Sequence, residues 1–136
     1  MITRTRNVLE IIMASNAALF FFGAIQHAGV ALGPFHEPRI VPASIVETLC
    51  GLSLLVGVTT IFRRSLASRR AAVVSNLVAL GGVLLGIAAL AVGAGPRTAS
   101  NDIYHSVMLA LIAAGLLILF TGTSGANAEK LREAKE

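Results

Sequence analysis

Long apolar runs, separated by short polar or basic segments, set the pattern of this chain. Four runs cover approximately residues 8–32, 41–62, 71–94 and 103–121. Each approaches or exceeds the roughly 20 residues that a helix needs to cross about 30 Å of hydrocarbon. The stretch Leu77–Ala94 carries no charge on any face, whereas a helix of a soluble bundle shows a polar stripe. We therefore predict an all-α fold, an integral membrane bundle of four transmembrane helices.

Turn-forming residues mark the ends of the predicted helices. Pro42 suits the first turn of the second helix, where a backbone N–H would have no partner within the helix. The stretch Gly93–Pro96 is expected to end the third helix, because proline cannot continue it. Asn101 or Asp102 is expected to cap the fourth helix at its N-terminus through a side-chain oxygen.

Composition agrees with a single membrane domain. Of the 136 residues, 55% are hydrophobic and 13% are charged, about half the charged share of a typical soluble domain. We place the transmembrane domain at residues 1–125 and a short charged cytoplasmic tail at 126–136. The one cysteine, Cys50, cannot form an internal disulfide or a cysteine-based metal site.

Basic residues are distributed unevenly between the two ends of the predicted bundle. Nine of the eleven lie before the first helix, between the second and third, or after the fourth: Arg4, Arg6, Arg63, Arg64, Arg69, Arg70, Lys130, Arg132 and Lys135. The other two, Arg39 and Arg97, lie in the remaining connections. The positive-inside rule therefore predicts a bacterial-type inner-membrane protein with both termini in the cytoplasm. The net charge of +4 forms no continuous basic face, so no nucleic-acid partner is expected.

Ionisable residues gather near the outer end of this topology. His27 lies towards the end of the first apolar run, Glu47 near the start of the second, and Asp102 and His105 near the start of the fourth. Their expected depths below the outer surface are roughly 3–9 Å at 1.5 Å per residue. Because charged groups at membrane depth are costly, each is a candidate functional residue. These four residues, together with Tyr104, are the candidate ligand-binding residues.

Other polar residues could support the same site. Helical spacing places Asn16 on one face with Gly23 and His27, and Asp102 on one face with His105, Met108 and Ile112. His36 and Glu37 occupy the outer loop directly above. Tyr104 either donates its hydroxyl to this layer or anchors the fourth helix at the membrane interface, and we expect anchoring.

Three interpretations of this polar layer stay open. His27, Glu47 and His105 could pair as a hydrogen-bonded latch that holds the outer end closed. Alternatively, a histidine and a carboxylate beside an apolar cavity could bind the oxygen of a quinone or sterol. A third interpretation makes His27 and His105 axial haem ligands, or joins them with Glu47 around a metal ion. The chain has no His-x-x-x-His ligand motif, so no metal is assigned.

Two motifs resemble a known family of membrane proteins. The segment Phe22–His27 is similar to the F-x-x-G-x-x-H/K signature on the first helix of DoxX-like proteins, although glycine and histidine are four residues apart here. The segment Ile45–Gly57 resembles the family's glutamate, small residue and leucine-rich run that ends in glycine. The resemblance covers roughly residues 8–120. It implies a four-helix membrane protein related to the small subunit of a thiosulfate:quinone oxidoreductase, with His27 and Glu47 as the residues to test.

We therefore predict a redox-linked accessory or quinone-binding subunit with a polar pocket near the outer face. The alternatives are a stand-alone membrane protein that binds a lipophilic ligand, metal or haem, and a structural membrane partner held by the His/Glu latch. Besides the lipid bilayer, the expected partners are a membrane or redox protein and a second copy of the chain. Gly82 and Gly86 suit close helix packing, either within the bundle or across a homodimer seam.

Overall fold

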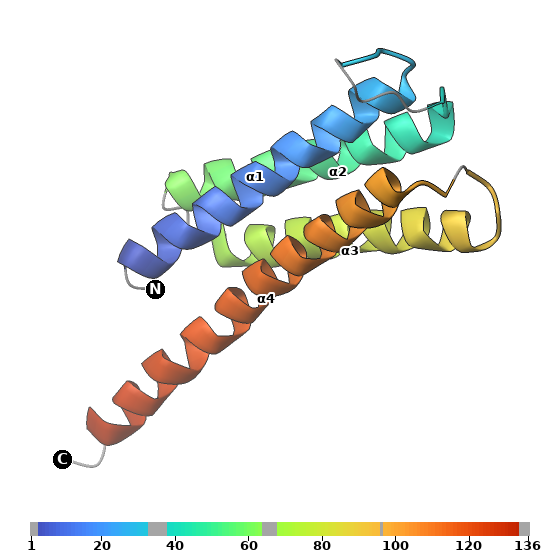
Figure 1. Cartoon of the computed structure of the whole chain (residues 1–136). Coiled ribbons are helices and arrows are strands. Elements are labelled where there is room, and N and C mark those ends of the chain that lie inside the picture. The colour runs from blue at the N-terminus through green and yellow to red at the C-terminus, as the bar shows by residue number, and fades with distance from the viewer. Residues whose placement is uncertain (1–2, 33–37, 64–67, 96, 134–136) are drawn as a thin grey trace.

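Four α-helices make up the fold (Figure 1). The computed structural model describes residues 3–32, 38–63, 68–95 and 97–133, with side chains as far as residue 121. The helices are α1 (Thr3–His27), α2 (Val41–Phe62), α3 (Ser68–Ala91) and α4 (Ala99–Glu133). Each contains a stretch long and apolar enough to cross a membrane. The prediction of an all-α chain with four membrane-spanning candidates is confirmed to that extent.

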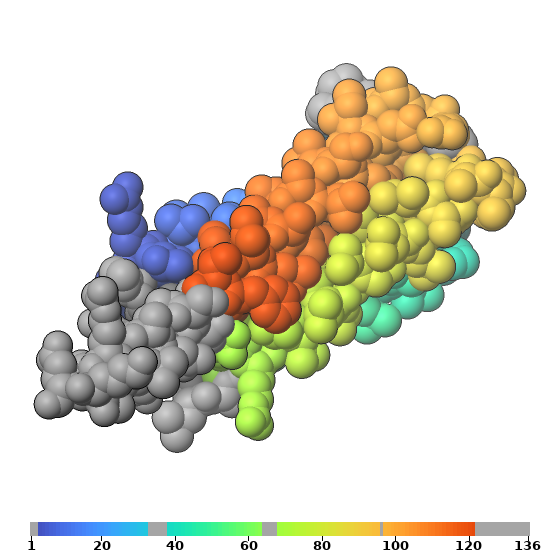
Figure 2. Space-filling view, turned by 90° about the horizontal axis from the view of Figure 1, so that it is seen from below, coloured from blue at the N-terminus to red at the C-terminus, as the bar shows by residue number. Residues whose placement is uncertain are grey.

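The helices form a ring in which each packs against its neighbours in sequence, and α1 and α4 close the ring. Figure 2 shows the face over which α3 and α4 lie side by side. The interior is filled by apolar side chains such as Met13, Phe20, Leu54, Met108 and Ile112. Many large apolar side chains instead face outward, including Val74, Leu77, Leu84, Leu85, Leu117 and Phe120. Such an apolar exterior is what a lipid environment would cover.

Helix α1 ends five residues before its apolar run does. Gly29 adopts a φ of 98°, a conformation that costs glycine no steric penalty. Its N–H donates to the Gln26 carbonyl, and the Val30 N–H donates to the Ile25 carbonyl, the bond pattern of a Schellman cap. The predicted run of 8–32 was therefore too long, and His27 is the last helical residue of α1 and not a residue several positions inside it.

Two of the predicted helix ends are confirmed, and the predicted cap of α4 is not. Gly93 has a φ of 76°, and the Ala94 N–H donates to the Ala89 carbonyl, so a second Schellman cap ends α3 where glycine predicted it. Pro42 occupies the first turn of α2, as predicted. The cap of α4 is different, because the Thr98 hydroxyl oxygen accepts a 3.1 Å hydrogen bond from the Asn101 N–H. Asn101 and Asp102 therefore lie inside α4, and the predicted cap was wrong.

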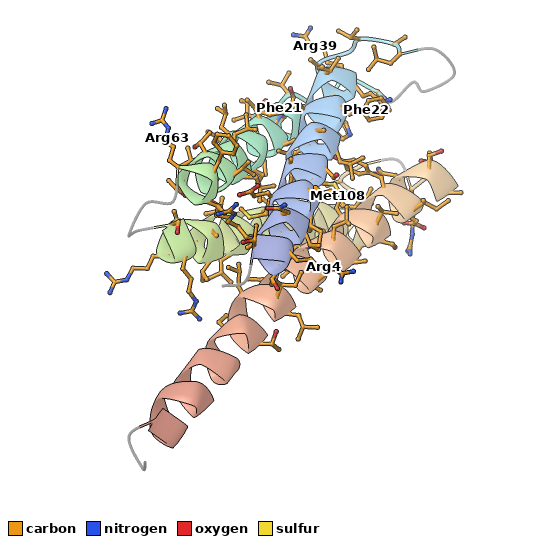
Figure 3. The ribbon with its side chains drawn as sticks, turned by 90° about the vertical axis from the view of Figure 1, so that its left-hand side faces the viewer. Arg4, Phe21, Phe22, Arg39, Arg63 and Met108 are labelled. Carbon is orange, nitrogen blue, oxygen red and sulfur yellow. The ribbon has the colours of Figure 1, made fainter. Side chains whose placement is uncertain are left out.

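The two ends of the bundle differ in charge. Arg4 begins α1 and Arg63 follows α2, and both lie at the end of the ring that we call the arginine end. Arg39 lies beside the end of α1 at the opposite end, which we call the cavity end (Figure 3). Helix α4 continues without a break to Glu133. Residues 126–133 of the predicted tail are therefore helical, although their side chains are outside the described part of the chain.

Candidate functional site

Three polar side chains from three helices form a connected network at the cavity end. The ring nitrogen Nδ1 of His27, on α1, lies 2.7 Å from Oε2 of Glu47, on α2. The other carboxylate oxygen, Oε1, lies 3.1 Å from the Tyr104 hydroxyl of α4. The same hydroxyl is 3.1 Å from the Leu19 carbonyl oxygen. The His27–Glu47 distance is that of a charge-assisted hydrogen bond, so the network ties α1, α2 and α4 together.

A glycine on α1 makes room for this network. A Cβ atom at Gly23 would collide with the Tyr104 hydroxyl oxygen and would stand 2.6 Å from Glu47 Oε1. The Tyr104–Glu47 hydrogen bond therefore passes directly over the α1 backbone at this position. Tyr104 points into the bundle, and the expectation that it anchors α4 at an interface is wrong.

His105 has a different partner from the one that the latch hypothesis assigned. Its Nδ1 lies 2.8 Å from the backbone carbonyl oxygen of Asn101, one turn earlier on α4. Because a carbonyl oxygen only accepts, Nδ1 carries the hydrogen, and Nε2 of the neutral ring presents a lone pair. That Nε2 lies against Gly86 of α3, where a Cβ would collide with it. Tyr104, and not His105, joins His27 and Glu47.

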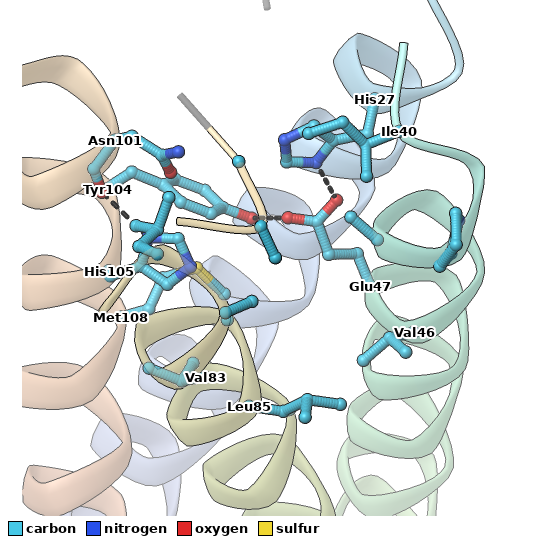
Figure 4. A pocket seen from close by; sticks show the side chains of 18 of the residues that line it. His27, Ile40, Val46, Glu47, Val83, Leu85, Asn101, Tyr104, His105 and Met108 are labelled. Atoms are coloured by element: carbon cyan, nitrogen blue, oxygen red, sulfur yellow. Dashed lines mark hydrogen bonds and ion pairs between the residues drawn. The ribbon is translucent and has the colours of Figure 1, made fainter. Parts of the chain in front are cut away.

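These polar groups line one side of a cavity of about 350 Å³ (Figure 4). Its size is within the range of sites that bind small organic ligands. Most of the wall is apolar and comes from α2 and α3. The lining residues are Phe20, His27, Ile40, Pro42, Ala43, Val46, Glu47, Gly82, Val83, Leu85, Gly86, Ala89, Leu90, Ala94, Gly95, Asn101, Tyr104, His105 and Met108.

The cavity reaches the surface along the seam between α2 and α3. Leu85 of α3 lines the cavity and is also 57% exposed, and Val46 of α2 faces it across the seam (Figure 4). Deeper in the bundle the seam is closed, because Gly82 lies against Val46 and Cys50. At the cavity end, Ile40 approaches to 3.7 Å of the position of a Cβ at Gly95 and covers the top.

The remaining predicted site residues lie elsewhere. Asp102 is exposed and lies 3.4 Å from Arg97, so it faces away from the cavity. The buried face of α4 contains Asn101, His105, Met108 and Ile112. Asn101 therefore takes the place on this face that the sequence pattern predicted for Asp102. Asn16 is fully buried on the same face as Gly23 and His27, but it does not line the cavity. His36 and Glu37 lie outside the described residues.

The predicted face of α1 is correct, as Asn16, Gly23 and His27 are all buried. On α2, Glu47, Gly51 and Leu54 are buried along one face. Gly82 lies against Cys50 of α2, and Gly86 lies against His105 of α4. Of the two predicted roles, this pair therefore has the packing role within the bundle.

The described residues contain no cluster of side chains suited to bind a metal ion. No group of three histidine, cysteine, aspartate or glutamate side chains lies close enough to hold a metal ion in that part of the chain. His27 and Glu47 are adjacent, but the Nδ1–H of His105 is directed to a backbone carbonyl of its own helix. The metal interpretation of His27, Glu47 and His105 therefore gains no support from the geometry.

Sequence reasoning missed several residues that shape the cavity. Asn101 is 6% exposed and fixes the His105 ring through its carbonyl oxygen. Its position one turn before His105 was a usable signal, because residues four apart share a helical face. Phe20 gave no comparable signal, and Gly86 was predicted only as a residue of close helix packing. Their contribution depends on how α1 and α3 are rotated against α4, which a single helix does not reveal.

No family model, curated protein or solved structure matches the chain. The resemblance to DoxX-like proteins therefore stays a prediction that rests on the two sequence motifs.

Proposed function

We propose that the chain is a multi-pass inner-membrane protein with the arginine end and both termini in the cytoplasm. Two observations support this topology. Four helices are long and apolar enough to span a bilayer, and nine of the eleven basic residues belong to the segments at the arginine end. In this orientation the cavity lies in the outer half of the membrane, and its side opening faces lipid.

We further propose that the protein binds a lipophilic molecule with a polar head group, of the quinone class, in the cavity. The observation that carries this proposal is the pairing of an apolar wall with a small set of converging polar groups from His27, Glu47, Tyr104 and His105. An apolar pocket with a few well-placed polar groups is the usual form of a small-molecule site. A ligand with a ring and an alkyl tail would place the ring beside the polar groups of the cavity and extend the tail through the seam between α2 and α3.

The role that fits best is an accessory subunit of a redox system, as the resemblance to DoxX-like proteins implies. The sequence contains one cysteine, Cys50, so it has no redox-active cysteine pair of its own. The chain would therefore bind or present a membrane-dissolved redox carrier for a partner protein.

A binding titration with a matched pair of variants tests the proposal. Ala89 lines the cavity, whereas its neighbour Ala88 is exposed on the outer surface of α3. Ala89→Phe fills the cavity with a ring and should weaken the binding of decylubiquinol, kept reduced under argon, to protein in lipid nanodiscs at least tenfold, about 1.4 kcal/mol. Ala88→Phe adds the same ring outside the cavity and should bind like the wild type. Equal binding by both variants, or no binding by the wild type, would refute the proposal.

The second candidate function is a structural latch, and the completeness of the His27–Glu47–Tyr104 network favours it. Both oxygens of Glu47 have partners on other helices, as expected of a buried carboxylate that holds helices together. Ligand binding by the wild type separates the two functions, and Glu47→Gln measures how much stability the network provides. A latch alone predicts a large loss of stability together with a wild type that binds no quinone analogue, whereas a binding site predicts that the wild type binds.

A further inference from the structure

The hydrogen-bonding character of the cavity wall indicates what kind of head group it accepts. Tyr104 has a single hydroxyl hydrogen, and two acceptors already lie 3.1 Å away, the Leu19 carbonyl and Glu47 Oε1. His27 and Asn101 have further interactions of their own. The structure therefore leaves no unshared hydrogen on Tyr104 for a ligand.

Nε2 of His105 is a polar atom of the cavity wall that has no hydrogen-bond partner among the described residues. The ring is 9% exposed, and no residue in the described part of the chain hydrogen-bonds this nitrogen. Of the two neutral tautomers, the bond to the Asn101 carbonyl selects the one with hydrogen on Nδ1, and in that tautomer Nε2 accepts a hydrogen bond and does not donate one. Figure 4 shows the ring directed from α4 into the cavity.

Two neighbours maintain this arrangement. Gly86 leaves the space that Nε2 occupies, since any side chain there would displace the ring. The Tyr104 and His105 rings meet edge to face with centroids 5.3 Å apart, which restricts rotation of the imidazole. The acceptor is therefore presented at a defined position between the aromatic residues and the apolar wall of α3.

We propose that His105 is a head-group-binding residue and that the ligand donates a phenolic hydroxyl to its Nε2. The inference rests on the proposed function and narrows it to the reduced, quinol-type form of the ligand class. A quinone carbonyl is an acceptor and finds a second acceptor at Nε2, whereas a quinol hydroxyl satisfies it. A buried acceptor discriminates strongly against a ligand that lacks the donor, because the site is then left unpaired.

A pair of ligands that differ in one methyl group tests the hydroxyl requirement. 4-Decylphenol donates a hydrogen bond, and 4-decylanisole, its methyl ether, does not. Wild-type protein in lipid nanodiscs should bind the phenol about tenfold tighter than the ether. His105→Phe keeps the ring and removes the lone pair, and it should bring the two affinities within about twofold of each other. Asp102→Asn, one turn away on the exposed side of α4, should keep the wild-type preference.

Nitrogen-15 spectra of the histidine side chains give a readout that needs no variant. His105 in the ligand-free protein should show the Nδ1–H tautomer, and its Nε2 resonance should shift with the phenol but not with the ether. An Nε2–H tautomer, equal affinities for the two ligands, or tighter binding of the ether would each overturn the role of His105. If Ala89→Phe still weakens both ligands in those cases, the proposed function stands. If the wild type binds neither ligand, the proposed function fails together with the inference.

Discussion

The substitution Gly23→Ala tests how closely α1 must approach the His27–Glu47–Tyr104 network. The new methyl group would collide with the Tyr104 hydroxyl oxygen and would stand 2.6 Å from Glu47 Oε1. The hydroxyl is the far end of a side chain that can rotate, so we expect Tyr104 to swing away while the helix stays in place. The cost is then the loss of the Tyr104–Glu47 hydrogen bond and of the bond to the Leu19 carbonyl.

The expected magnitude follows from two opposing effects. Losing a hydrogen bond to a carboxylate costs about 1.5–3 kcal/mol, and alanine is favoured over glycine inside a helix by about 0.5–1 kcal/mol. The free energy of unfolding should therefore fall by about 0.5–2.5 kcal/mol. The sign of the change is the important result, since helix propensity by itself predicts an increase in stability.

Denaturation of the purified protein in mixed micelles, followed by circular dichroism, measures this change. Gly81→Ala is the matched control, because Gly81 lies in the middle of α3 and has nothing within 4 Å of an added Cβ. It should leave stability unchanged or raise it by up to about 1 kcal/mol. In a Tyr104→Phe background, Gly23→Ala should lose the part of its cost that comes from the hydroxyl, whereas the contact of the methyl group with Glu47 Oε1 remains.

Two outcomes would refute this reasoning. Gly23→Ala could be as stable as the wild type, in which case the network has no tight contact with α1. Alternatively, its cost could be the same with and without the Tyr104 hydroxyl, which would show that the methyl group does not act through this hydroxyl.

The remaining predictions concern topology and the buried amide of α1. With Cys50 replaced by alanine, a membrane-impermeant maleimide added to intact cells should label Arg39→Cys and not Arg63→Cys; the reverse pattern would invert the proposed orientation. Asn16 is fully buried, and neither polar atom of its side chain has a hydrogen-bond partner in the described part of the chain. Asn16→Leu should therefore raise the free energy of unfolding by about 1–2 kcal/mol, and a fall measured by the same denaturation would mean that the amide has a partner such as an internal water.

Local signals in the sequence predicted the number of helices and some of the helix ends. Apolar length and the absence of charge identified the four helices, and Gly93 and Pro42 marked two ends correctly. The end of α1 was placed too late, because the residues after His27 are as apolar as those before it and hydrophobicity carries no information about φ. Gly29 held that information, but a glycine within an apolar run is also compatible with a continuing helix.

The sequence predicted that the polar residues lie at one end of the bundle, but it did not predict which of them are in contact. Alternating helix direction brings His27, Glu47 and His105 to one end of the bundle, as expected. Which of them touch depends on the rotation of each helix about its axis, and a rotation of one residue exchanges Asp102 for Asn101 on the buried face of α4. Tyr104 joined the network because Gly23, on a different helix, leaves space for its hydroxyl.

The sequence by itself determined that this chain folds as four long apolar helices and that its polar groups fall at a common level. Chain connectivity and the length of each apolar run are sufficient for both conclusions. The tertiary structure decided that His27, Glu47 and Tyr104 form one network, that Nε2 of His105 faces a cavity, and that Asp102 lies outside. Those results depend on contacts between helices, where the absence of one Cβ atom at Gly23 or Gly86 determines which side chain fits.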